Sequence, residues 1–156
     1  MLLKGSCHCG SIKFQVESPH PYPFNLCYCS VCRKTAGGGG YAINLSGRFS
    51  TLKIEGIEHE NVYHAIIDGQ KSPAERHFCK RCASALWIYD ARWPDLVHPF
   101  ASAIDTELPV VPEQTHLMLN SKAAWVEIER KKNDKCYAEY PDESIAQWHE
   151  RLNLSE

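Results

Sequence analysis

The chain has 156 residues and a formal net charge of −2, with hydrophobic residues at 44% and charged residues at 23%. These values are typical of a soluble globular domain with one hydrophobic core, and they argue against nucleic-acid binding, which usually needs a strongly basic face. No apolar run is long enough to cross a bilayer, and the first residues hold no signal-peptide core. We therefore expect no membrane contact and a cytoplasmic location, with a nuclear one also open.

Alternating apolar and polar residues predict strands along much of the chain. The predicted strands cover residues 11–16, 41–45, 50–56 and 61–67, two segments within 75–89, and residues 100–106 and 123–130. Proline-rich and polar stretches predict the loops and turns between them, at residues 18–23, 46–49, 92–99 and 107–114.

The C-terminal tail shows a different pattern. Ile145, Trp148 and Leu152 fall at helical spacing, and Pro141 with the acidic residues after it suits the start of a helix. No repeat or domain boundary is visible. The sequence therefore predicts one mainly β domain over residues 1–156, built of antiparallel sheets and ending in a helix.

Seven of the eight cysteines lie in three tight clusters, and Cys136 stands alone. The clusters are Cys7 with Cys9, then Cys27, Cys29 and Cys32, then Cys79 with Cys82. A disulfide framework is disfavoured, because cysteines two residues apart reach bridging geometry only under strain and cytoplasmic thiols stay reduced. A redox C-x-x-C pair is also disfavoured, because that motif should open a helix in a βαβ unit, whereas Cys79 lies between two strand-like stretches. Zinc ligation explains the grouping better than either alternative.

Seven thiolates divide into four and three. Three of them come from one run of six residues, Cys27 to Cys32, which leaves Cys7, Cys9, Cys79 and Cys82 as a closed set of four. Structural zinc sites are closed and catalytic sites keep one position open, so we expect two zinc sites, one structural and one open. Spacing leaves undecided whether His8, His77 or a water molecule completes the second site, and whether that site is occupied.

A zinc ion with three thiolates favours a fourth sulfur, so the expected substrate is a small thiol that reacts at its sulfur. The extra negative charge needs nearby cations, and Arg33 and Lys34 follow Cys32 directly. Gly38 and Gly39, within the glycine run 37–40, could place backbone N–H groups against a peptide-like ligand, or the run could be a flexible turn.

These motifs resemble a known family. G-S-C-H-C-G at residues 5–10, then C-x-C-x-x-C-R-K with glycines after it, then F-C-x-x-C, is similar to the glutathione-dependent formaldehyde-activating enzymes, whose domain centromere protein V shares. The resemblance runs from Gly5 to about Trp125. One departure is Ala83-Ser84 after the last C-x-x-C, where the family often carries glycine, a residue that relieves a positive φ.

The resemblance implies a mainly β, zinc-stapled fold and the same division of the cysteines. By it, Cys7, Cys9, Cys79 and Cys82 form the structural site, and Cys27, Cys29 and Cys32 form the catalytic site. It also implies a carbon–sulfur lyase, or synthase, that joins glutathione as co-substrate to formaldehyde and gives S-hydroxymethylglutathione.

Two functions follow, in different classes. The first is a zinc-dependent enzyme acting on a glutathione adduct; the second is a non-catalytic zinc module that carries glutathione or binds a protein. The sequence names no general base and no oligomeric state. His98, His116, Trp87 and other aromatic residues are expected to pack in the core rather than to act on a ligand.

Overall fold

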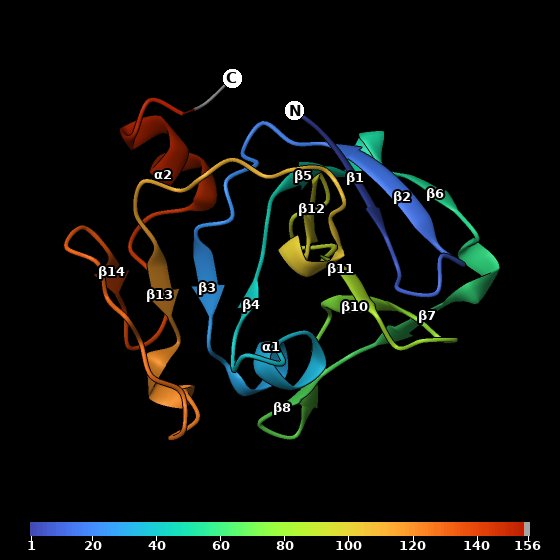
Figure 1. Ribbon diagram of the computed structural model, residues 1–156. Helices are drawn as coiled ribbons and strands as arrows, with labels where there is room; N and C mark the ends of the chain where they lie inside the picture. The colour runs from blue at the N-terminus through green and yellow to red at the C-terminus, as the bar shows by residue number, and fades with distance from the viewer. Residues whose placement is uncertain (155–156) are drawn as a thin grey trace.

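The structure is a computed structural model that describes residues 1–154. It confirms a mainly β fold with antiparallel sheets and one short C-terminal helix (Figure 1). The N-terminal sheet has three antiparallel strands in the order β1-β2-β6. They are β1 (Leu2–Ser6), β2 (Lys13–Glu17) and β6 (Lys53–Glu55).

The largest sheet has five antiparallel strands in the order β5-β12-β11-β10-β7. They are β5 (Gly47–Arg48), β7 (Glu60–Tyr63), β10 (Glu75–Cys79), β11 (Ala85–Tyr89) and β12 (Leu96–Pro99). A small hairpin projects beside it, formed by β8 (Ile66–Ile67) and β9 (Gln70–Lys71).

The third sheet has the order β14-β13-β3-β4 and contains the parallel pairs of the fold, β13 with β3 and β13 with β14. Its strands are β3 (Asn25–Cys27), β4 (Ala42–Ile43), β13 (Thr115–Leu117) and β14 (Lys135–Cys136). Two α-helices, α1 (Ser30–Thr35) and α2 (Ile145–Arg151), and four short 3₁₀ helices complete the part of the chain that the structure describes.

The main core lies between the first two sheets. In β2 the apolar residues Phe14 and Val16 are buried and their polar neighbours are not, as period-two alternation requires. Phe14 meets Trp87 of β11 edge to face, with ring centroids 5.0 Å apart. Cys7 and Cys79 belong to the same buried cluster, so one cysteine group is built into the core.

Helix α2 closes one side of the third sheet. Ser144 caps it, accepting a hydrogen bond from the Gln147 amide while the Gln147 side chain accepts one from the Ser144 amide. Trp148 is fully buried and stacks on Phe24, with ring centroids 3.8 Å apart. This contact holds the C-terminal segment against the strand that leads to Cys27.

Several predicted elements are confirmed. The 11–16 strand is present as β2, residues 75–89 form two strands around a cysteine turn, and the tail forms α2. The helix begins at Ile145 rather than beside Pro141, because Ser144 is the residue that caps it.

Other predictions are wrong. Residues 46–49 and 92–99, for which the sequence predicts a turn and a loop, contain β5 and β12, which pair with each other. The predicted strand at 100–106 is a 3₁₀ helix, Ala101–Ala103, followed by extended chain, and 123–130 has no strand. In that last segment the alternation reflects Val126 and Ile128 packing on a small cluster, with no partner strand beside them. The sequence pattern predicts no helix at α1, because a helix of six residues is too short to show a helical period in its apolar residues.

No helix among the described residues combines the length and apolar character that a bilayer crossing needs.

Candidate metal centres

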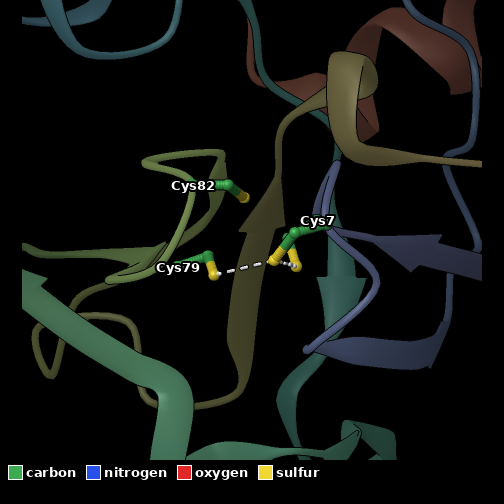
Figure 2. A group of neighbouring side chains, drawn as sticks. Cys7, Cys79 and Cys82 are labelled. Atoms are coloured by element: carbon green, nitrogen blue, oxygen red, sulfur yellow. Dashed lines mark hydrogen bonds between the residues drawn. The ribbon is translucent and has the colours of Figure 1, made fainter.

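Four cysteines from two distant chain segments meet between the first two sheets. We call Cys7, Cys9, Cys79 and Cys82 the four-cysteine group; their sulfur atoms all lie within 4.8 Å of one another. The Cys9 sulfur is 3.6 Å from that of Cys7 and 3.8 Å from that of Cys79. Figure 2 shows Cys7 on one side facing Cys79 and Cys82 on the other.

The first half of this group is a turn that follows β1. The Gly10 amide donates to the Cys7 carbonyl at 2.9 Å, and Gly10 has a φ of +73°, a conformation that glycine adopts without strain. The Ile12 amide donates to the Cys7 sulfur at 3.2 Å. The turn therefore brings both sulfurs close to that of Cys79 and supplies one backbone donor, to Cys7.

The second half is the turn between β10 and β11. The Ala83 amide donates to the Cys79 carbonyl at 2.8 Å, and the Cys79 amide donates to the Ser84 carbonyl at 3.0 Å. Ala83 has a φ of +63°, the left-handed region in which a β-carbon is strained. This residue departs from the glycine that related motifs often carry, and the backbone keeps the glycine conformation in spite of it.

We expect Ala83→Gly to stabilise the protein by up to about 1 kcal/mol, because the left-handed conformation costs roughly 1–2 kcal/mol for a residue with a side chain. The higher entropy of glycine in the unfolded chain reduces the gain. Urea unfolding of the metal-loaded protein measures it, with Ala85→Gly in β11 as the matched control that should destabilise. Equal or lower stability for Ala83→Gly would contradict the strain.

The environments of the sulfurs in this group differ. Burial raises the pKa of Cys79 to about 11, whereas a hydrogen bond with the Ser84 hydroxyl lowers the pKa of Cys82 to about 5. The Arg81 guanidinium donates to the Ser11 hydroxyl at 3.2 Å and so joins the two turns. Burial disfavours thiolate at Cys79 in the metal-free protein, and a bound cation would reverse that preference.

The second group is local in sequence. We call Cys27, Cys29 and Cys32 the cysteine trio; their sulfurs also lie within 4.8 Å of one another. Cys27 ends β3, Cys29 is the N-cap of α1, and Cys32 lies one turn into that helix. The Cys29 sulfur accepts a hydrogen bond from the Cys32 amide at 3.3 Å. The short helix thus folds the C-x-C-x-x-C run back on itself.

The sulfurs of the trio differ in pKa. Hydrogen bonds with Cys27 and Cys32 lower the pKa of Cys29 to about 2, whereas hydrogen bonds with Cys29 and Cys32, together with burial, raise the pKa of Cys27. The Arg76 guanidinium lies beside Cys32, with a nitrogen 3.6 Å from its sulfur, and also donates to the Thr35 hydroxyl. Sequence reasoning missed Arg76, because only the pairing of β10 brings it to the trio.

Both groups fit zinc by the chemistry of their donors. Four clustered sulfurs match a closed tetrahedral zinc site, and three match a site with one position left for another ligand. Neither His8 nor His77 joins a metal-sized group among residues 1–154. The two ring nitrogens of His77 make hydrogen bonds with Glu60 and Glu75, so neither nitrogen is left to bind a metal ion.

The trio opens into a cavity of about 320 Å³, which we call the trio cavity. Its polar wall includes Asn44, Arg76 and His98, and the C-terminal segment from Tyr140 to Ile145 forms another side. The rest of the lining is largely apolar, including Phe24, Ile88, Leu117 and Met118. A ligand in this cavity would therefore meet three sulfurs and few charges.

The predicted glutathione contacts lie elsewhere. Arg33, Lys34 and Gly38 line a separate cleft of about 670 Å³, beside the four-cysteine group, which we call the α1 cleft. Gly39 is not among its lining residues, and added β-carbons at Gly38 and Gly39 would meet no close contact. Gly40 is the constrained position, because its φ is +93° and a β-carbon there would lie 2.3 Å from Val126.

Comparison with known proteins shows which family the chain belongs to. Residues 2–121 match the family described as glutathione-dependent formaldehyde-activating enzyme. The chain belongs to that family. The matched range contains all seven clustered cysteines of the chain, but it ends before β14 and α2. The C-terminal wall of the trio cavity therefore lies outside the family match.

Two relatives extend the comparison for this family member. A protein of Halomonas elongata, which carries the name "Putative glutathione-dependent formaldehyde-activating enzyme", is 69% identical over 156 residues, covering all of this chain and 99% of the relative. A crystal structure of a Rhodobacter sphaeroides protein superposes with a TM-score of 0.54 and 26% identity, covering 68% of this chain and 91% of that one.

Proposed function

We propose that this chain is a zinc-dependent carbon–sulfur lyase or synthase that acts on a glutathione adduct, as an S-hydroxymethylglutathione synthase does. The family membership and the name of the Halomonas elongata relative support glutathione-dependent formaldehyde activation in general. The observation that carries the finer assignment is the position of the trio. Within residues 1–154 the trio has no fourth metal-binding side chain beside it, and it lines a cavity of about 320 Å³ in which a small thiol would find room.

The two groups are assigned different roles. Cys7, Cys9, Cys79 and Cys82 would hold a structural zinc ion, and Cys27, Cys29 and Cys32 would hold a second one at the reaction site. When bound, the second ion would supply a soft site that keeps an incoming thiol in its reactive thiolate form. Arg76 beside Cys32 would offset the negative charge that collects there, a role the sequence assigned to Arg33 and Lys34.

The remaining assignments concern the ligand and the cell. Arg33, Lys34, Gly38 and Gly39 stay proposed contacts for the peptide part of glutathione, now in or beside the α1 cleft rather than at the sulfurs. Residues 1–156 are proposed to form one zinc-binding domain with a small thiol as partner and a cytoplasmic location. A nuclear location gains no support, because the Halomonas elongata relative is bacterial.

The open cavity at Cys29 favours an enzyme over a carrier or an interaction module. The test is exchange spectroscopy of glutathione and formaldehyde by NMR, because their adduct also forms without a catalyst. The zinc-loaded protein is expected to raise the exchange rate in proportion to its concentration, and Cys136→Ser, far from both groups in sequence, is expected to match it. No acceleration with formaldehyde, and no turnover of any other glutathione conjugate, would overturn the proposal.

A further inference from the structure

One histidine faces the trio cavity with a free ring nitrogen. His98 lies in β12 and lines the cavity together with the three cysteines. Its Nδ1 is 3.0 Å from the carbonyl oxygen of Leu45, and only a protonated Nδ1 can make that hydrogen bond. The proton of the neutral ring is thereby fixed on Nδ1, and the lone pair is on Nε2. No hydrogen bond within residues 1–154 reaches Nε2.

The register of the five-stranded sheet explains why His98 faces this cavity. Arg76, Ile88 and His98 are direct cross-strand partners in β10, β11 and β12. Residues paired in this way project from the same face of a sheet, and all three line the cavity. Arg76 contacts Cys32, so this row of three residues has the trio at one end and the His98 imidazole at the other.

A second polar group beside His98 is also without a partner. The side-chain Oδ1 of Asn44 is fully buried and receives no hydrogen bond from the described residues, although buried oxygens are nearly always paired. Asn44 precedes Leu45, lines the same cavity and bridges to Phe100 just after β12. The wall of the trio cavity beside His98 therefore holds an unpaired, buried oxygen as well as the imidazole.

We propose that His98 is the proton carrier of the trio cavity, with Nε2 taking the proton of an incoming thiol and delivering it to the aldehyde oxygen. The assignment rests on the proposed function. In the forward reaction the S–H bond breaks, a C–S bond forms, the π electrons of the C=O bond move to oxygen, and that oxygen receives the proton. Nothing is oxidised or reduced, and the reverse sequence cleaves the adduct.

The surroundings of His98 suit this role. Burial lowers the pKa of His98, against the opposing effects of the Leu45 hydrogen bond and of Asp90, so the ring is neutral and able to accept a proton at pH 7. A thiol such as that of glutathione has a pKa of about 8.5, so it arrives with its proton. The other titratable groups that line the cavity, the cysteines aside, are Arg76, Tyr140 and Glu143.

The test is His98→Asn, whose side-chain amide can still donate to Leu45 but is not a base. We expect the enzyme-dependent exchange rate to fall by a factor of about 10² to 10⁴, with zinc content and unfolding midpoint unchanged, and added imidazole to restore part of the rate. A rate within about twofold of wild type would overturn the proposal. His98→Gln serves the same comparison if His98→Asn does not fold.

A second readout needs no turnover. Glutathione is titrated calorimetrically into the zinc-loaded wild type and into the variant, in two buffers of different ionisation enthalpy, to count released protons. The variant is expected to release about one proton more than wild type, because the negative charge of the bound thiolate favours the imidazolium form of His98 and so raises its pKa in the complex. Equal proton counts would refute His98 as the acceptor of the thiol proton, even if the exchange assay showed no catalysis. A difference in proton count without catalysis would uphold this role of His98 and refute only the proposed reaction.

Discussion

Cys79→Ser is expected to abolish folding, with a molten or aggregated product and no cooperative thermal transition. Cys79 is fully buried in the main core and belongs to the four-cysteine group. A structural zinc site contributes about 10–16 kcal/mol of apparent binding free energy, as much as or more than the roughly 5–15 kcal/mol of a whole domain. Losing one of four ligands removes much of that contribution and leaves a polar hydroxyl in the core.

The measurement is circular dichroism during heating, together with the soluble yield and zinc content of the purified variant. Cys136→Ser is the matched control, because Cys136 is exposed and belongs to neither cysteine group. It should unfold at the wild-type temperature with wild-type zinc content. A Cys79→Ser protein as stable as this control would show that the four-cysteine group does not support the fold.

Cys29→Ser is expected to do the opposite, keeping the fold and losing the reaction. Cys29 caps α1 through its sulfur, and serine is among the best N-cap residues, so its hydroxyl can accept the same hydrogen bond from Cys32. The trio would then offer two sulfurs and a hydroxyl, a poor set for zinc. We predict about one zinc ion per chain instead of about two, and turnover of the glutathione adduct at the uncatalysed rate.

Zinc analysis and the exchange assay on the same preparation check this result, with the thermal midpoint as the measure of folding. A midpoint more than a few degrees below wild type would place the trio among the elements that stabilise the fold. Two retained zinc ions with full turnover would remove the trio from the reaction. In either case the division of labour between the two groups would be wrong.

The cysteine positions carried most of what sequence could predict about the site. The C-x-x-C between two strand-like segments and the C-x-C near the N-terminus have spacings that mark them as half-sites, and the structure brings their sulfurs together. The same holds within the trio, because a run of six residues limits how far its sulfurs can separate. The family resemblance, carried by these motifs, is confirmed by the match over residues 2–121.

The rest of the site depends on pairing that no local pattern encodes. Arg76 and His98 reach the trio cavity only through the register of β10, β11 and β12, and β12 itself lies in a stretch whose composition predicts a loop. Because Arg33 and Lys34 follow Cys32 in the sequence, they are the cations that the sequence predicts beside the trio, but in the structure they line the α1 cleft. The parallel pairing of β13 with β3, which supports Cys27, joins segments about ninety residues apart.

The central claim is that three neighbouring sulfurs hold a metal ion and leave room for a sulfur from outside. X-ray absorption at the zinc edge, recorded on wild type and on Cys29→Ser with and without glutathione, tests it most directly. In wild type, which should carry about two zinc ions per chain, glutathione is expected to raise the average number of sulfur neighbours per zinc; in the variant it should change nothing. An unchanged wild-type spectrum at saturating glutathione, or only one zinc ion per wild-type chain, would contradict the account.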